Sequence, residues 1–319
     1  MKNVLILGGS GFIGQSILQK MICSDEYSIM AVQHRSMLHN LHGCDNICIV
    51  RSSLADLDIS NLPVIPDVII HAARSRTEML GRVGRYGMAM KGQIDNKRLI
   101  TQVQNINKSI KVIYISGSLV YGNHSDMIVT EHTDLSPISF AREYVHAEYP
   151  FFKAAQKGNA NVALIRIPWV IGLGSWFKWY YTDVMNKYGF VPIYGAGYNM
   201  MTFMDVDYLA TAVSGLCHTD FKGILNLYHP KYLLQCEWAD LLSRISKMEI
   251  KRLDERQCKT FGKAALEAFN TDVCLSSVHK DIQDILLPQQ PELEVVIANY
   301  LRKMLRDKPN LHYIPFKNS

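Results

Sequence analysis

The sequence contains no pair of cysteines at CxxC spacing, no long run of Lys or Arg and no apolar run long enough to span a bilayer. Its seven cysteines are scattered along the chain, which predicts reduced thiols rather than a disulfide framework or a metal site. The net charge of +5 is mild, so we expect neither nucleic acid nor a membrane surface as a partner. The pattern of a secretory signal peptide is also missing, and we expect a cytoplasmic protein.

A glycine-rich turn is present near the start of the sequence. It follows an apolar strand predicted for residues 3–7 and precedes a segment whose apolar residues recur with the period of a helix. Glycine allows a sharp turn and the close approach of a pyrophosphate, and the start of the helix supplies unpaired N–H groups. The spacing is GxxGxxG, and it predicts a dinucleotide site formed by Gly8, Ser10, Gly11, Phe12, Ile13 and Gly14.

Predicted strands and helices alternate over the first half of the chain. The strands are expected at residues 28–32, 47–50, 67–70, 111–115 and 161–165, with helices at 88–107 and 140–157. This alternation predicts an α/β fold with a doubly wound, Rossmann-type parallel sheet, whose ligands bind at the carboxyl ends of the strands. We interpret residues 1–172 as the dinucleotide-binding domain. Residues 173–319 are expected to form mainly a smaller lobe that covers the substrate, and some of its elements are free to return to the large sheet.

The segment after the second predicted strand bears on the choice of cofactor. An acidic side chain at this place usually binds the ribose 2′-hydroxyl of NAD, whereas an arginine accommodates the 2′-phosphate of NADP. The sequence has no carboxylate here, but it has Arg35 and Ser36. This pattern favours NADP(H) over NAD(H). The alternative is that Arg35 is simply solvated.

Five segments resemble those of the short-chain dehydrogenase/reductase superfamily, in particular its extended branch of nucleotide-sugar epimerases, dehydratases and reductases. They occur in the order of that family and extend over residues 1–212. The segments are 8–14 (GGSGFIG), 67–73 (DVIIHAA), 113–122 (IYISGSLVYG), 166–172 (RIPWVIG) and 203–210 (FMDVDYLA).

This resemblance implies a nicotinamide dinucleotide cofactor, a small-molecule substrate that is anionic or a nucleotide sugar, and a homodimer. One feature weakens the case for a nucleotide sugar. The family commonly has an arginine just before the position of Phe203, where residues 199–202 of this chain are Asn, Met, Met and Thr. The resemblance also implies that the cofactor contacts Leu54, His71, Ala72, Ala73, Ser116 and Pro168.

The catalytic positions depart from the family. Its hydride-transferring members use a Ser or Thr after the fifth strand, and a Tyr four residues before a Lys on the next helix. In this alignment Phe140 stands in the Tyr position and Tyr144 in the Lys position. Phenylalanine has no proton to exchange, and tyrosine carries no positive charge to lower the pKa of a neighbour. Either Ser118 or Gly117 matches the family's serine, so Ser118 either orients a substrate oxygen or caps the following turn.

A literal YxxxK sequence occurs at Tyr149 and Lys153. Tyr149 lies nine residues after Phe140, which places it about half a turn away around the helix. Pro150 stands between Tyr149 and Lys153 and is expected to disturb the turn that would pair them. We therefore interpret Tyr149 as an ordinary helix residue and Lys153 as a surface lysine.

Two further clusters allow two interpretations each. The arginines that follow the fourth predicted strand, in a segment that also contains glycines, either close over an anionic ligand or are simply solvated. A run of aromatic residues either stacks on a substrate or forms the core between the lobes or a dimer surface. The arginines are Arg74, Arg76, Arg82 and Arg85, and the aromatic residues are Trp176, Phe177, Trp179, Tyr180 and Tyr181.

Two functional hypotheses follow. The first is an atypical NAD(P)-dependent reductase, epimerase or dehydratase that acts on a hydroxyl or carbonyl group of a sugar-like or other small molecule. Its predicted catalytic residues are Ser118 and Tyr144, with His146 or water as alternative proton sources. The second is a non-catalytic protein that binds NAD(P) as a sensor or partner subunit, which predicts tight cofactor binding without turnover.

Overall fold

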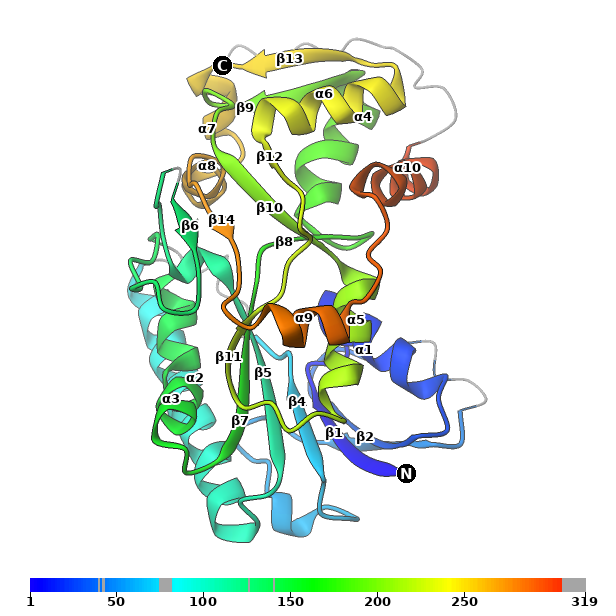
Figure 1. The fold of residues 1–319 in the computed structure, drawn as a ribbon, viewed down its shortest axis with the longest axis vertical. Helices are drawn as coiled ribbons and strands as arrows, with labels where there is room; N and C mark the ends of the chain where they lie inside the picture. Colours follow the sequence, from blue (N-terminus) through cyan, green and yellow to red (C-terminus); the bar gives the residue numbers. More distant parts are fainter. Residues whose placement is uncertain (40, 42–43, 75–81, 126, 140, 306–319) are drawn as a thin grey trace.

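A large parallel sheet covered by helices on both faces lies below a smaller lobe in the view of Figure 1. The structure is a computed structural model that describes residues 1–39, 41, 44–74, 82–125, 127–139 and 141–305. None of the helices within these ranges is long and apolar enough to cross a membrane.

The large sheet has seven strands within the described residues, and every neighbouring pair runs parallel. Its strands, in their order across the sheet, are β11 (Gly223–Asn226), β7 (Asn161–Ile167), β5 (Lys111–Gly117), β4 (Val68–His71), β1 (Lys2–Leu7), β2 (Tyr27–Gln33) and β3 (Ile47–Arg51). This arrangement confirms the predicted α/β class with a parallel sheet of the Rossmann type.

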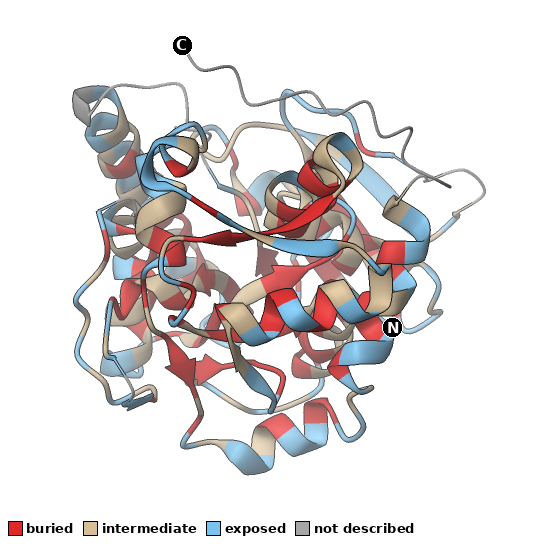
Figure 2. Cartoon of the chain, turned by 90° about the horizontal axis from the view of Figure 1, so that it is seen from above, coloured by how far each residue is buried: buried red, intermediate tan, exposed pale blue. Residues whose placement is uncertain are grey.

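Both faces of the sheet are apolar, which explains why helices cover both. In β1, Val4 and Ile6 contribute to the core on one face, whereas Leu5 and Leu7 contribute to the core on the other. Figure 2 shows buried strands in the interior and helices with exposed outer faces. The first face is covered by α1 (Phe12–Ile22), α5 (Val206–Leu216) and α9 (Lys280–Leu286), and the second by α2 (Arg82–Ile106) and α3 (Arg142–Lys157).

The smaller lobe has its own aromatic core. Phe177, Tyr181, Trp238 and Phe269 are fully buried there, whereas Trp179 is 58% exposed. Most of the predicted aromatic run therefore belongs to the core of this lobe. Its strands are β6 (Ile128–Val129), β8 (Trp169–Ile171), β9 (Phe190–Tyr194), β10 (Met200–Asp205), β12 (Tyr232–Leu234), β13 (Glu249–Leu253) and β14 (Cys274–Leu275). Its helices are α4 (Asp183–Tyr188), α6 (Gln235–Ser246), α7 (Glu255–Lys259), α8 (Lys263–Phe269) and α10 (Leu293–Met304).

Elements from the second half of the chain return to the large sheet. β11 pairs with β7, where Leu225 lies opposite Ile165, and α5 packs against the same core as α1. The Asp205 carboxylate caps α5 by accepting hydrogen bonds from the N–H groups of Asp207 and Tyr208 at 2.9 and 3.0 Å. Residues after 172 thus contribute to both parts of the molecule. Short helical turns occur at η1 (Ile59–Asn61), η2 (Ser118–Val120) and η3 (Lys178–Thr182).

Helix α2 begins earlier than expected and includes residues 82–87, which the sequence placed in a basic loop. Contacts with α3 hold this first part of the helix. Arg85 Nε lies 3.3 Å from Glu143 Oε1, and the Tyr86 ring packs edge-on against His146 with centroids 5.7 Å apart. These contacts help offset the cost of about 1 kcal/mol for each helical glycine. The side chain of Arg82 lies outside the described part of the structure, as do Arg76, Gly81 and Phe140.

Helix α3 runs through Pro150, so the disruption expected at this proline is wrong. Proline removes one N–H donor, but Glu148 and Phe151 are both buried and fix the helix on either side of it. Lys153 Nζ remains 5.6 Å from the centroid of the Tyr149 ring. Tyr149 itself is 45% exposed.

Candidate active site

The turn after β1 passes so close to the chain that follows β4 that only glycine fits. Gly8 has a φ of +86°, and a Cβ atom on it would lie 2.5 Å from the Ala73 nitrogen. A Cβ atom on Gly14 would lie 2.1 Å from the Gly8 oxygen. The Leu7 carbonyl accepts a hydrogen bond from the Ala72 N–H at 2.9 Å, which holds the two segments together. The predicted residues of the β1 turn and of the segment after β4 therefore meet at one point.

Helix α1 starts at this turn without a side-chain cap. Gly11 precedes the helix in an extended conformation, and the first helical turn contains no acidic residue. An anion at this end of the helix thus meets no competing carboxylate on it. The Phe12 ring packs against Gly172, where a Cβ atom would lie 2.7 Å from the ring. Ser10 and Ile13 are half-buried beside it.

His71 ends β4 and orders the backbone that faces Gly8. Burial lowers the pKa of His71 to about 4, so its ring is neutral at pH 7. Its Nδ1 accepts a hydrogen bond from the Ala73 N–H at 3.3 Å, which leaves the ring proton on Nε2. Nε2 then donates to Asn96 Oδ1 at 2.9 Å. The neutral histidine thereby holds Ala73 against the glycine turn.

The end of β5 brings two serines to the same edge. Ser116 is buried, and its Oγ has no hydrogen-bond partner among the described residues. Ser118 begins η2, is 4% exposed and accepts a hydrogen bond from the Tyr121 N–H through its carbonyl at 3.0 Å. Pro168 is half-buried between β7 and β8. A buried hydroxyl without a protein partner is suited to a ligand, because leaving it unpaired is costly.

Tyr144 lies in the first turn of α3 and contacts Arg74, which follows β4. The Arg74 Nη1 donates a hydrogen bond to the Tyr144 hydroxyl, and its guanidinium carbon lies 3.9 Å from the centroid of the Tyr144 ring. Tyr144 also packs beside Leu119, at the boundary with Ala268 of the smaller lobe. Tyr144 thus lies between the large sheet and that lobe.

The predicted cofactor residues Arg35, Ser36 and Leu54 follow the neighbouring strands β2 and β3. Arg35 and Ser36 follow β2 and are exposed. Leu54 follows β3 and packs partly buried against the core that includes Leu57. The strand order β4-β1-β2-β3 therefore arranges these segments in a row along one edge of the sheet.

A buried ion pair supports this edge and was not predicted from the sequence. Arg166 Nη2 donates to Glu148 Oε1 at 2.6 Å, and both side chains are 1% exposed. The guanidinium lies 4.8 Å from the centroid of the Tyr121 ring, whose hydroxyl donates to Asn226 Oδ1 at 2.8 Å. The pair joins β7 to α3, which carries Tyr144. A charged residue inside the apolar strand at 161–167 was the signal that could have revealed it.

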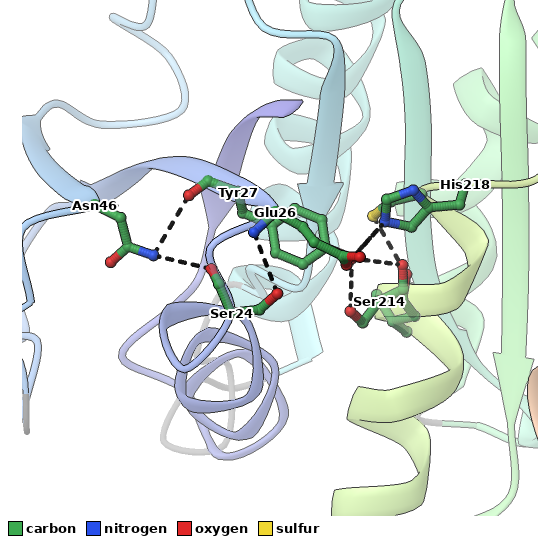
Figure 3. Close-up of polar contacts among 8 residues, drawn as sticks. Ser24, Glu26, Tyr27, Asn46, Ser214 and His218 are labelled. Carbon is green, nitrogen blue, oxygen red and sulfur yellow. Dashed lines mark hydrogen bonds and ion pairs between the residues drawn. The ribbon is translucent and has the colours of Figure 1, made fainter. Parts of the chain in front are cut away.

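At the opposite, amino edge of the sheet, the polar groups around Tyr27 are paired with one another (Figure 3). The Tyr27 hydroxyl lies 2.9 Å from Ser214 Oγ and 2.7 Å from His218 Nε2. Asn46 Nδ2 donates to the carbonyls of Tyr27 and Ser24 at 3.4 and 3.3 Å. Burial raises the pKa of Tyr27. This cluster ties the start of β2 to the end of α5.

The carboxyl edge fits a bound dinucleotide. The glycine turn leaves room for close backbone approach, the uncapped start of α1 is suited to an anion, and Ser116 has a hydroxyl without a partner among the described residues. Within the described ranges, no group of three or more His, Cys, Asp or Glu side chains is arranged to hold a metal ion.

Parallel strands in this order, helices on both faces and a glycine turn between the first strand and first helix define a Rossmann-type α/β protein. The chain belongs to the NAD-dependent epimerase/dehydratase family, whose model matches residues 4–224 and thus more than half of its length. This match confirms the resemblance to the extended short-chain dehydrogenases/reductases. No curated protein matches the sequence.

Several solved structures share this fold. UDP-glucuronic acid 4-epimerase from Bacillus cereus, in complex with NAD, has a TM-score of 0.75 and 16% identity, covering 95% of this chain and 100% of that chain. DesIV, a dTDP-glucose 4,6-dehydratase from Streptomyces venezuelae with NAD and TYD bound, has a TM-score of 0.74 and 15% identity, covering 94% and 96%.

UDP-N-acetylglucosamine 4-epimerase from Methanobrevibacter ruminantium M1, in complex with UDP-N-acetylmuramic acid, is similar over 95% of this chain and 96% of that chain. Its TM-score is 0.73 at 22% identity. At identities this low, the structural similarity establishes a common fold. The activity of this chain has to be argued from its own residues.

Proposed function

We propose that this protein is a nicotinamide-dinucleotide-dependent enzyme that oxidises or reduces a hydroxyl or carbonyl group of a sugar-like molecule, with nucleotide sugars as the first candidates. The observation that carries the proposal is the approach of Gly8 to Ala73, which leaves no space for a Cβ atom. This approach, at the uncapped start of α1, suits a pyrophosphate. The family and the nucleotide-sugar enzymes with the same fold support the substrate class.

The proposed chemistry needs a group that exchanges a proton. A bound oxidised nicotinamide would supply the acceptor for a hydride from a carbon that carries a hydroxyl group. Loss of this hydride and of the hydroxyl proton turns C–OH into C=O. We assign the proton to Tyr144, which accepts it as a phenolate and returns it when the carbonyl is reduced. Ser118 is proposed to donate a hydrogen bond to the same substrate oxygen.

The choice between NAD(H) and NADP(H) depends on two opposing observations. Arg35 and Ser36 are exposed after β2, where they suit a 2′-phosphate. The structures from Bacillus cereus and Streptomyces venezuelae contain NAD. We retain NADP(H) as the prediction from Arg35, and binding measurements decide it.

Isothermal titration calorimetry with NADH and NADPH tests cofactor binding in the wild type, Arg35→Ala and Arg244→Ala. The Arg244 side chain on α6 is 67% exposed and serves as a matched control. We expect Arg35→Ala to weaken NADPH binding about tenfold and to leave NADH binding unchanged. Arg244→Ala should bind like the wild type. Binding of neither dinucleotide contradicts the proposed function.

A second measurement separates an enzyme from a non-catalytic binding protein. The latter is favoured by Phe140, which offers no hydroxyl at the family's Tyr position. The cofactor-loaded protein is incubated with UDP-glucose, UDP-glucuronic acid, UDP-N-acetylglucosamine and dTDP-glucose, and the sugar protons are followed by NMR. A new epimer or dehydrated product supports the enzyme. Tight cofactor binding without any product favours the binding protein.

The assembly state is a separate part of the proposal. A homodimer is implied by the family resemblance, and sedimentation velocity at micromolar protein concentration measures it directly. A single species with the mass of two chains supports the dimer, and a single species with a mass near 36.2 kDa contradicts it.

A further inference from the structure

In the family, a lysine supplies the positive charge beside the catalytic tyrosine. In this chain, Arg74 places a positive charge beside Tyr144 from another part of the sequence. Arg74 lies three residues after the end of β4, whereas Tyr144 is in the first turn of α3. The guanidinium carbon is 3.9 Å from the centroid of the Tyr144 ring, and Nη1 donates a hydrogen bond to the phenolic oxygen. The positive charge is thus in contact with both the face of the ring and its hydroxyl.

Carboxylates near Tyr144 have other partners. On α3 itself, Glu143 lies 3.3 Å from Arg85, and the buried Glu148 is bound to Arg166. On α8, the carboxylate of Glu267 accepts hydrogen bonds from the N–H and hydroxyl of Ser139 at 2.7 and 2.8 Å. Within the described residues, no carboxylate lies within 4.0 Å of the Arg74 guanidinium in an ion pair. Its charge is therefore directed at Tyr144.

Tyr114, a titratable group that faces this pair, is neutral. Tyr114 on β5 is buried, and burial raises its pKa well above the usual range. A neutral Tyr114 neither competes for the guanidinium nor repels a phenolate on Tyr144. The environment of Tyr144 thus combines one permanent cation with a neutral phenol and with carboxylates that are already paired.

We propose that Arg74 is a positioning residue that stabilises the phenolate of Tyr144, and so replaces the lysine of the family's Tyr/Lys pair. A guanidinium in contact with a phenol favours its ionised form, and arginine keeps its charge at every working pH. Tyr144 would then exchange the proton, although the sequence alignment places it at the lysine position. This inference rests on the proposed function and gives Tyr144 the partner that its sequence position lacks.

The literal YxxxK motif provides a matched comparison within the same helix. Lys153 Nζ lies 5.6 Å from the centroid of the Tyr149 ring, and that tyrosine is 45% exposed. The Lys153 charge is screened by solvent, and Lys153 makes no hydrogen bond to the Tyr149 hydroxyl among the described contacts. The contact with a permanent cation therefore distinguishes Tyr144 from Tyr149.

NMR titration of protein labelled with ¹³C at Cζ of tyrosine tests the inference without any substrate. The signal of Tyr144 is assigned by its loss in Tyr144→Phe. We expect this signal to titrate at a pH at least about one unit higher in Arg74→Gln than in the wild type. Arg74→Lys should restore part of the shift, and Lys153→Gln should leave the Tyr144 signal unchanged.

The outcomes separate this inference from the proposed function. Equal titration of Tyr144 in the wild type, Arg74→Gln and Arg74→Lys overturns the role of Arg74, whatever the protein turns over. The remaining tyrosine signals report whether each variant is folded. If Arg74→Gln is not folded, the titration of Tyr144 is compared between Arg74→Lys and the wild type. A shifted Tyr144 in a protein that binds no dinucleotide supports the electrostatic pairing and contradicts only the proposed function.

Discussion

Tyr144 and Tyr27 lie at opposite edges of the same sheet and have different surroundings. The Tyr27 hydroxyl is hydrogen-bonded to the side chains of Ser214 and His218, and burial raises its pKa (Figure 3). Tyr144 is half-buried, and its partner is the Arg74 guanidinium. The first environment favours a neutral phenol that contributes to stability. The second places a permanent cation against the phenol, at the edge where the cofactor is proposed to bind.

The same contrast extends to the backbone at the two edges. At the amino edge, Asn46 binds the carbonyls of Ser24 and Tyr27, so a side chain takes up polar groups of the main chain. At the carboxyl edge, α1 starts without a side-chain cap and Ser116 Oγ has no partner within the described residues. The start of β2 at the amino edge thus has the character of a structural joint, whereas the carboxyl edge beside α1 has that of a binding site.

Tyr144→Phe is expected to have the largest effect, because it removes the proposed proton carrier and keeps the ring. We expect turnover of an identified substrate to fall by about 100-fold or more. The free energy of unfolding should change by less than about 1 kcal/mol. Steady-state kinetics and urea denaturation measure the two quantities. Unchanged turnover would remove Tyr144 from the mechanism.

Acid stability tests the neutral His71 at the carboxyl edge. Its folded pKa of about 4 lies below the reference value of 6.5, so the unfolded chain binds more protons between these values. Stability therefore decreases as pH falls through this window, by up to about 1.4 kcal/mol per pH unit from this group. Denaturant unfolding of His71→Gln should show a correspondingly weaker dependence on pH. The same slope in wild type and variant would contradict the buried, neutral ring.

Of the three substitutions, Tyr27→Phe is expected to have the smallest effect. Unlike Tyr144→Phe, it should lower stability and leave cofactor binding unchanged. Loss of its hydroxyl leaves Ser214 and His218 without this partner, which should lower the free energy of unfolding by about 1–2 kcal/mol. Affinity for the dinucleotide should stay unchanged, because the cluster lies at the other edge. Tyr149→Phe, at an exposed tyrosine, provides the control and should change stability by less than about 0.5 kcal/mol. Weaker cofactor binding in Tyr27→Phe would contradict the separation of the two edges.

Local patterns were enough to predict the sheet and the glycine turn. An apolar strand followed by GxxGxxG and a helix can be recognised without tertiary contacts, and Gly8 and Gly14 have the close approaches that this pattern requires. The resemblance to the family also indicated Ala72 and Ala73 as residues near the cofactor. These features depend on residues close in sequence or on the regular order of parallel strands.

Other features depend on distant contacts that no local pattern reveals. Arg74 and Tyr144 are 70 residues apart, and the sequence indicated only that the arginine follows a strand. The helix at 82–87 results from packing between α2 and α3, which overrides the helix-breaking tendency of glycine. The continuity of α3 through Pro150 results from the burial of Glu148 and Phe151 on either side of the proline. The role of Phe177 and Tyr181 stayed open because aromatic residues serve equally in cores and in binding sites.

Hydrogen exchange of the backbone, measured by mass spectrometry with saturating NADH and separately with NADPH, tests whether the carboxyl edge binds the cofactor. We predict slower exchange at residues 8–14, 71–74 and 116–118 with at least one dinucleotide. Exchange at 24–28 and 214–218 should not change. Unaltered exchange of the glycine turn, or slowing confined to the amino edge, would contradict the assignment of the site.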